Sequence, residues 1–155
     1  MRTRRITDPE REKVRKRLNK SDQLITDIAY QTGLRISDIL QLPSNLNSTR
    51  ISVREQKTGK KRVVHIKANT LRQCKAYAAK HKNADGTLFD CDRTTVYRHI
   101  RQAAKELGLE NISAHSYRKA YAHAYYMRYG LKATQKEMQH NNIATTCIYV
   151  FDWRE

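Results

Sequence analysis

The chain has 155 residues, a length that fits one domain rather than a multidomain enzyme. It carries 31 Lys and Arg against 15 Asp and Glu, a formal net charge of +16, and 39% hydrophobic residues, which exclude a compositionally disordered chain. These values predict a folded protein that binds a polyanion.

Three cysteines, Cys74, Cys91 and Cys147, lie far apart and form no C-x-x-C pair. This spacing disfavours a zinc ribbon, and an odd, sparse count disfavours a disulfide scaffold. No apolar run approaches the roughly 18 residues of a membrane span, and the N-terminus lacks the apolar segment of a signal peptide. We therefore expect reduced thiols, a cytoplasmic location and no membrane partner.

The first half of the chain predicts three helices and one hairpin. A basic arm, residues 1–8, leads into a helix whose start is marked by Asp8, Pro9 and Glu10. Apolar residues at helical spacing then predict a helix from Ser21, capped by residues 21–22, to Gly33, and a short helix over residues 36–42. Segments 49–56 and 61–67 are rich in β-branched residues and flank a turn at residues 57–60, which predicts an antiparallel β-hairpin.

Helical spacing continues through the second half of the chain. It predicts helices over residues 70–82, 96–107, 113–130, 133–139 and 143–151. No repeat, low-complexity segment or linker divides the chain. We therefore expect one mainly α (α+β) domain over residues 1–155, with a small antiparallel sheet.

A small set of cationic and polar residues could perform chemistry together. His115 and Arg118 are three residues apart, so both project from one face of a helix. That spacing alone is typical of ordinary surface residues. Four further residues complete the set. Arg35 follows the glycine that stops a helix, Lys57 lies at the hairpin tip, His140 ends another helix, and Tyr149 comes nine residues later.

This set suits cleavage of a phosphodiester without a metal ion. Two arginine forks match the two non-bridging oxygens and stabilise charge that grows in the transition state. A phenol, with an ordinary pKa near 10, can attack phosphorus when a histidine or nearby positive charge assists, and a lysine can protonate the departing oxygen. Asp38 is the acid nearest to Arg35, and no carboxylate cluster is present, which disfavours a two-metal nuclease.

Four segments carry these residues in a pattern that resembles the tyrosine recombinases, the phage integrase-like site-specific recombinases. Segment 32–40 (TGLRISDIL) resembles the first arginine box, and segment 56–60 (QKTGK) the hairpin lysine motif. Segment 115–118 (HSYR) resembles the His-x-x-Arg box, and segment 140–149 (HNNIATTCIY) the box that ends on the nucleophile. The resemblance covers residues 6–151 and implies a helical catalytic domain with a small β-hairpin.

The resemblance also implies a role for each residue of the set. Arg35 and Arg118 would hold the scissile phosphate, and Lys57 would be the general acid for the 5′ oxygen. Attack by a 5′ hydroxyl from another duplex would then reverse the step, so the implied reaction needs no cofactor, neither ATP nor metal.

The remaining three residues would act at the nucleophile. Tyr149 would form a covalent 3′-phosphotyrosine, His115 would assist proton transfer at the tyrosine, and His140 would donate a hydrogen bond to the phosphate. The family usually has glycine before this last histidine, whereas Gln139 stands here. We therefore expect a glutamine to form that turn and to shift His140.

Double-stranded DNA is the implied partner. The hairpin region has a large excess of basic residues, for which contact with the DNA backbone is the better explanation. These residues are Arg50, Arg54, Lys60, Lys61, Arg62 and Lys67. The resemblance further implies a homo-tetramer on DNA, an accessory DNA-bending protein, and a place at the nucleoid of a bacterial or phage-infected cell. Typical integrases have a separate N-terminal core-binding domain, which we expect to be absent here.

Two other functions stay open. One is a non-catalytic DNA-binding regulator built on the same domain, against which the complete set of catalytic residues argues. The other is a generic basic RNA-binding protein, which explains the charge but not the motifs.

Overall fold

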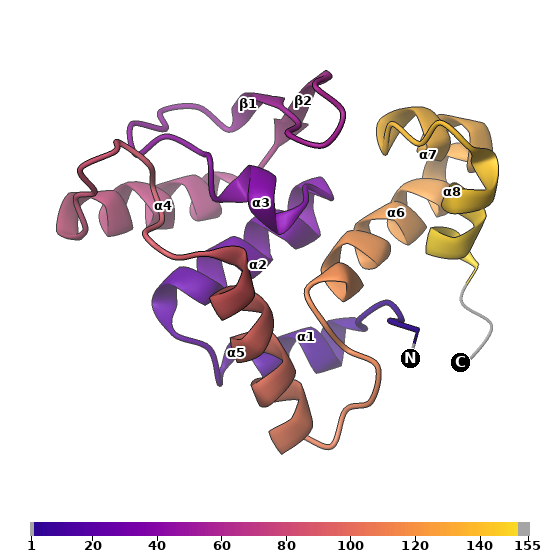
Figure 1. Ribbon diagram of the computed structural model, residues 1–155, viewed down its shortest axis with the longest axis horizontal. Coiled ribbons are helices and arrows are strands. Elements are labelled where there is room, and N and C mark those ends of the chain that lie inside the picture. The colour runs from indigo at the N-terminus through magenta and orange to yellow at the C-terminus, as the bar shows by residue number, and fades with distance from the viewer. Residues whose placement is uncertain (1, 152–155) are drawn as a thin grey trace.

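A computed structural model describes residues 2–151 of the chain. The outer ends of the predicted 1–155 domain, Met1 and residues 152–155, lie outside the described residues. The elements, in chain order, are α1 (Asp8–Arg15), α2 (Lys20–Thr32), α3 (Ile36–Ile39), β1 (Arg50–Arg54), β2 (Lys61–His65), α4 (Ala68–Lys80), α5 (Arg93–Glu106), α6 (His115–Tyr129), α7 (Leu131–Glu137) and α8 (Ile143–Val150). The hairpin lies beside α3, and α6, α7 and α8 group together (Figure 1).

Side-chain caps determine where the first two helices begin. Thr7 and Glu10 form a reciprocal capping box at the start of α1. Helix α2 starts before the predicted Ser21, because the side chain of Asn19 accepts a hydrogen bond from the peptide N–H of Asp22. The prediction that residues 21–22 form the cap was therefore wrong.

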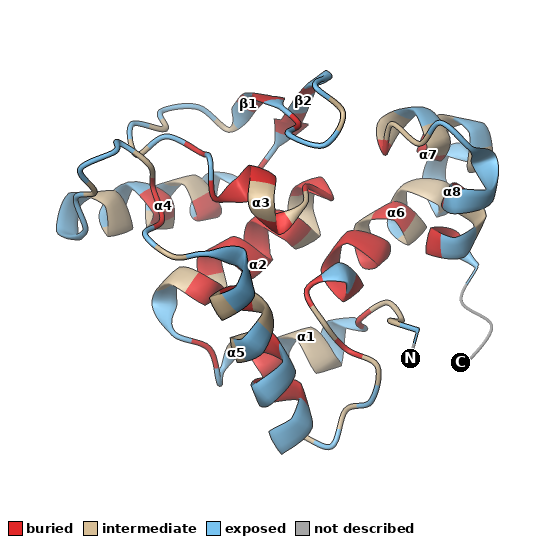
Figure 2. Ribbon diagram, viewed as in Figure 1, coloured by how far each residue is buried: buried red, intermediate tan, exposed pale blue. Residues whose placement is uncertain are grey.

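Helix α2 lies at the centre of the main core. Its Leu24, Ile25 and Ile28 have no exposed surface, and it packs against α3, α4 and α6. Figure 2 shows buried residues concentrated on α2, α3 and the first turns of α6, with exposed residues along the outer faces of α4 and α5. The core thus fixes the starts of α3 and α6, which carry Arg35 and Arg118.

The hairpin pairs β1 with β2 in antiparallel register. Ile51 lies opposite Val64, and Val53 lies opposite Arg62. Both strands alternate between exposed and buried residues, so these four side chains face inward. The sheet is shorter than the predicted segments 49–56 and 61–67, but its position and pairing are confirmed.

A second, smaller apolar cluster joins the last three helices. It contains Ala122, Met138, Tyr149 and Val150. This cluster holds α8, and with it Tyr149, against α6. The predicted fold class, mainly helical with one small antiparallel sheet, is confirmed. Within residues 2–151 no helix has the length and apolar character needed to cross a membrane.

Candidate active site

A cavity of about 200 Å³ opens where the hairpin turn meets the starts of α3, α5 and α6. Arg35, Lys57, His115 and Arg118 all line it. Four residues predicted from three separate segments therefore share one cavity. Arg93 and Tyr97, one turn apart on α5, line it as well.

Arg118 forms the buried floor of the site. The residue is 1% exposed, and its guanidinium donates to the carbonyl of Gly33 and, at 3.5 Å, to that of Met138. Burial, reinforced by the nearby Arg35 cation, lowers the pKa of Arg118 from its ordinary value. Among the described residues its Nε–H has no hydrogen-bond acceptor. The guanidinium is thus fixed by main-chain carbonyls in a residue that lines the cavity.

Arg35 stands just before α3 and is held by an acid that the sequence did not single out. Its Nη1 donates to Oε2 of Glu55 at 2.7 Å. Asp38, the acid nearest to Arg35 in the sequence, has a different partner. Its carboxylate accepts a hydrogen bond from the peptide N–H of Gln56 at 2.9 Å. Asp38 therefore anchors the hairpin to α3, and Glu55 is the partner of Arg35.

Tyr149 lies on α8 among imidazoles and cations. Its hydroxyl is hydrogen bonded to Nε2 of His115, and the centroids of the two rings are 5.4 Å apart. The ring of His140 is 4.9 Å away, the guanidinium carbon of Arg118 5.7 Å and Nζ of Lys119 5.8 Å. The residue is 9% exposed, so the phenol is positioned rather than free on the surface. Tyr149 therefore lies next to three of the other predicted catalytic residues.

Both histidines of the site are neutral at neutral pH. The imidazole of His115 contacts Tyr149 and, although the residue is exposed overall, burial of the ring and the charge of Arg118 lower its pKa to about 4. The same two causes lower the pKa of His140 to about 4. A neutral imidazole can accept a proton, and Nε2 of His115 is the ring nitrogen beside the phenol.

Gln139 adopts the left-handed conformation that glycine would favour, with a φ of +56°. Its side-chain amide donates to the carbonyl of Lys61 at 3.1 Å, which ties this turn to β2. His140 follows with its ring beside Tyr149 and its Nδ1 2.9 Å from Oγ1 of Thr146. The glutamine therefore forms the turn, and His140 still lies beside the predicted nucleophile.

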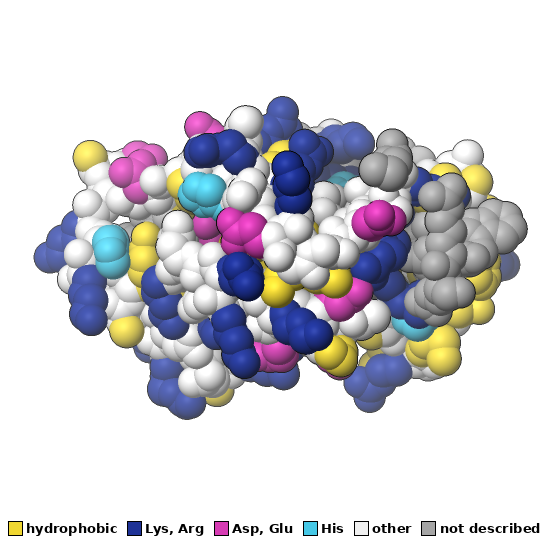
Figure 3. Space-filling view, turned by 90° about the horizontal axis from the view of Figure 1, so that it is seen from below, with side chains coloured by type: hydrophobic (Ala, Val, Ile, Leu, Met, Phe, Trp, Pro, Cys, Tyr) yellow, Lys and Arg dark blue, Asp and Glu magenta, His cyan; other side chains and the backbone are white. Residues whose placement is uncertain are grey.

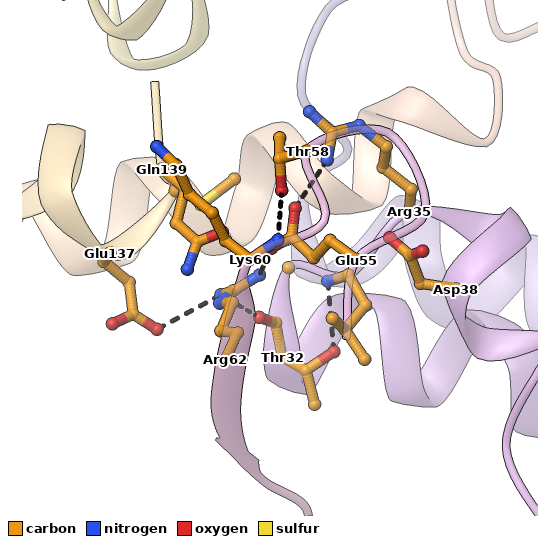
Figure 4. A network of polar contacts seen from close by, with 12 residues as sticks. Thr32, Arg35, Asp38, Glu55, Thr58, Lys60, Arg62, Glu137 and Gln139 are labelled. Atoms are coloured by element: carbon orange, nitrogen blue, oxygen red, sulfur yellow. Dashed lines mark hydrogen bonds and ion pairs between the residues drawn. The ribbon is translucent and has the colours of Figure 1, made fainter. Parts of the chain in front are cut away.

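Five of the six basic residues predicted to contact DNA are exposed: Arg50, Arg54, Lys60, Lys61 and Lys67. Arg62 is not, because it occupies an inward position of β2. Its side chain is 4% exposed and forms ion pairs with Glu55 and Glu137 (Figure 4). The expectation that Arg62 offers a surface contact was therefore wrong.

Basic charge alone does not locate the site. Figure 3 views the molecule from below and shows Lys and Arg spread over this face too, with Asp and Glu among them. The cavity and its side chains define the candidate site, and the lining includes Arg93 and Tyr97, which the sequence motifs did not indicate. Their spacing of four indicated one face of α5, but no sequence signal showed that this face turns toward the hairpin.

No group of three or more His, Cys, Asp or Glu placed to hold a metal ion occurs within residues 2–151.

Comparisons with known proteins identify a family for the chain. The sequence model of the phage integrase family matches residues 4–152. Tyrosine recombinase XerA of Saccharolobus solfataricus is 31% identical over 133 residues, covering 83% of this chain and 45% of its own length. The probable integrase/recombinase YoeC of Bacillus subtilis is 30% identical over 142 residues, covering 85% of this chain and 78% of its own.

Solved structures share the fold. A crystal structure of XerA recombinase superposes with a TM-score of 0.80 at 20% identity, over 99% of this chain and 62% of that one. The lambda integrase catalytic core gives 0.71 at 23% identity, over 88% of this chain and 91% of that one. The chain spans about half the length of the XerA relatives that it matches. A family match over nearly the whole length, together with the shared fold, shows that the chain belongs to the phage integrase family.

Proposed function

We propose that the chain is the catalytic part of a site-specific DNA recombinase that works through a covalent phosphotyrosine at Tyr149. The observation that carries this proposal is the hydrogen bond between the Tyr149 hydroxyl and a neutral His115, beside a cavity lined by Arg35, Lys57 and Arg118. A non-catalytic binder would not require this alignment.

The cavity supplies the charges that a phosphodiester requires. Arg118 is fixed by main-chain carbonyls and lines the cavity, while Arg35 lines it from the start of α3. Two fixed guanidinium groups can bind both non-bridging oxygens, and they favour the extra negative charge of the transition state over that of the ground state. His140 donates a further hydrogen bond to the phosphate.

Strand cleavage is then a single phosphoryl transfer from the 5′ oxygen to the tyrosine. The phenolic oxygen of Tyr149 attacks phosphorus and its proton passes to Nε2 of His115. The bond from phosphorus to the 5′ oxygen breaks, and Lys57 gives that oxygen a proton. The products are a 3′-phosphotyrosine and a free 5′ hydroxyl. Attack by another 5′ hydroxyl reverses the step, so neither ATP nor a metal ion takes part.

The exposed cations support double-stranded DNA as a partner that lies across the hairpin side of the molecule. Arg50, Arg54, Lys60, Lys61 and Lys67 form a basic hairpin surface that contacts the phosphate backbone. Related solved structures support this partner, because XerH is bound to its difH substrate in a post-cleavage complex. Lambda integrase appears as a tetramer on a Holliday junction, which supports a homo-tetramer for this chain too. An accessory DNA-bending protein, and action at the nucleoid of a bacterial or phage-infected cell, complete the proposal.

Nicked duplexes drawn from the DNA beside the gene test the mechanism, because loss of the short strand traps the covalent complex. Wild-type protein should give a protein–DNA adduct on a denaturing gel, and Tyr149→Phe should give none. Tyr129→Phe, at an exposed tyrosine of α6, is the matched control and should behave as wild type. A wild type that binds the duplex tightly but never forms the adduct would refute catalysis and favour the regulator function.

Arg118→Lys separates cleavage from binding. A lysine ammonium is a point charge and cannot bind two phosphate oxygens as a fork does. The rate of adduct formation should therefore fall far more than duplex affinity. Equal losses of both would contradict the role assigned to Arg118.

A further inference from the structure

A buried glutamate lies beside the cavity, and the proposed chemistry does not use it. Glu55 has no exposed surface and follows β1 on the same inward side as Ile51 and Val53. A carboxylate at such a position is costly unless cations pair with it. Glu55 lies between Arg35, at 2.7 Å, and Arg62, at 3.8 Å (Figure 4).

The pairing continues beyond these two arginines. Arg62 also contacts Glu137 at 3.1 Å, and the hydroxyl of Tyr121 donates to the same carboxylate at 2.8 Å. Glu137 is the last residue of α7, which leads into the turn before His140. The charges alternate along Arg35, Glu55, Arg62 and Glu137, so each carboxylate in this row lies beside at least one guanidinium.

Glu55 also forms the main-chain base of the hairpin turn. Its N–H donates to the carbonyl of Lys60 at 3.0 Å, and its own carbonyl accepts from Gly59 at 2.8 Å. Lys57 lies inside the turn that these two bonds close. One residue therefore joins the turn that carries the proposed general acid to the guanidinium that receives the phosphate.

We propose that Glu55 is a positioning residue that orients Arg35 for the phosphate and sets the hairpin lysine at a fixed place relative to it. The hydrogen bond to Glu55 uses only Nη1 of Arg35, so Nε and Nη2 stay available to phosphate oxygens. This inference rests on the proposed function for its kinetic test, but the Glu55–Arg35 contact can be tested without DNA.

The variant Glu55→Gln keeps the side-chain shape and removes the charge. With nicked duplex at saturation, the rate of adduct formation should fall about 10–100-fold, the range expected when a catalytic group is misplaced. Duplex affinity should change by less than about twofold, because the cations that contact the backbone are unaltered. Glu12→Gln, at an exposed glutamate of α1, is the matched control and should leave both quantities unchanged. A higher rate in Glu55→Gln would show that Glu55 competes with phosphate and would overturn the proposal.

A double-variant cycle separates positioning from a general effect on the fold. If Glu55 acts through Arg35, the rate of Arg35→Ala should not fall further when Glu55→Gln is added. Losses that multiply would show an independent action of Glu55 and would refute the positioning role. If Glu55→Gln does not fold, as judged by circular dichroism, Glu55→Asp takes its place, since it keeps the charge but draws it away from Arg35. The same loss of rate is expected, and an unchanged rate would overturn the proposal.

A measurement on the free protein distinguishes failure of this inference from failure of the proposed function. In nitrogen-15 spectra of the wild type, the guanidinium of Arg35 should show hindered rotation about its Nε–Cζ bond, lost in Glu55→Gln. Free rotation in the wild type would refute the contact whether or not the protein cleaves DNA. Hindered rotation without any adduct would refute the proposed function alone.

Discussion

Substitution of Gly33 by alanine should destabilise the protein far more than the same change at a matched glycine. Gly33 ends α2 with a φ of +71°, and a Cβ added there would lie 2.3 Å from Cδ1 of Tyr121. The ring cannot move away freely, because its hydroxyl donates to Glu137 and the guanidinium of Arg62 lies 5.6 Å from its centroid. Both the backbone and the ring therefore oppose a side chain.

The cost can be divided into two parts. The left-handed conformation costs an alanine about 1–2 kcal/mol, and forcing a methyl group into a filled site costs about 1–3 kcal/mol more. Gly108 has nearly the same φ, +70°, but nothing lies within 4 Å of its added Cβ. Gly33→Ala should therefore lower the free energy of unfolding by about 2–5 kcal/mol, and Gly108→Ala by about 1–2 kcal/mol.

Urea unfolding followed by circular dichroism measures both values. The decisive quantity is the excess loss at Gly33, and it should vanish when Gly33→Ala is made in a Tyr121→Ala background. Equal losses at the two glycines, or an excess that persists without the ring, would refute the reasoning. The carbonyl of Gly33 accepts from Arg118, so the folded fraction of Gly33→Ala should also form adduct more slowly.

Three further predictions concern the site. His115 and His140 have a pKa of about 4 in the folded protein, below the value of about 6.5 for an unfolded histidine, so both take up protons on unfolding. The free energy of unfolding should therefore decrease as the pH falls from 6.5 toward 4. Urea titrations at pH 7 and pH 5 measure this decrease, and an equal loss of stability in the wild type and in His115→Gln would contradict it. Gln139→Gly should be more stable than Gln139→Ala by about 1 kcal/mol, since both lose the amide and only alanine is strained at positive φ, and an alanine variant of equal stability would exclude that strain. Arg93→Ala should reduce the slope of log affinity against log salt by about 0.9, which binding isotherms at several salt concentrations measure; an unchanged slope would exclude a phosphate contact by Arg93.

Local patterns in the sequence were enough to predict most of the elements. Periodicity placed the helices and the hairpin to within a few residues, because the side chains that form these patterns are the ones that the core buries. The start of α2 was misplaced because two caps competed within four residues. Asn19 is the cap, while the carboxylate of Asp22 is buried and binds His99 at 2.6 Å. That partner lies on α5 and is not visible in a local pattern.

The inward-facing charges show a different limit. Ile51 and Val53 fix the inner face of β1, and Val64 fixes that of β2, so alternation places Glu55 and Arg62 on the same side. The excess of basic residues over the whole hairpin suggested that Arg62 lies at the surface, although the alternation of inward and outward residues along β2 places it inside. The pairing of Glu55 with Arg35, by contrast, depends on how the hairpin packs on α3, and sequence spacing contains no information on that.

The burial of Arg118 has a consequence for copies of this domain that are no longer selected for cleavage. Its guanidinium joins the carbonyls of Gly33 and Met138, which belong to distant parts of the chain, so its loss would leave buried acceptors without a donor. Loss of the Tyr149 hydroxyl alone, as in Tyr149→Phe, would remove its hydrogen bond to His115 but leave the ring in its apolar cluster, so it would disturb folding less. Degenerate descendants should therefore lose the tyrosine long before the arginine, and the presence of Arg118 alone is a poor guide to whether such a descendant is active.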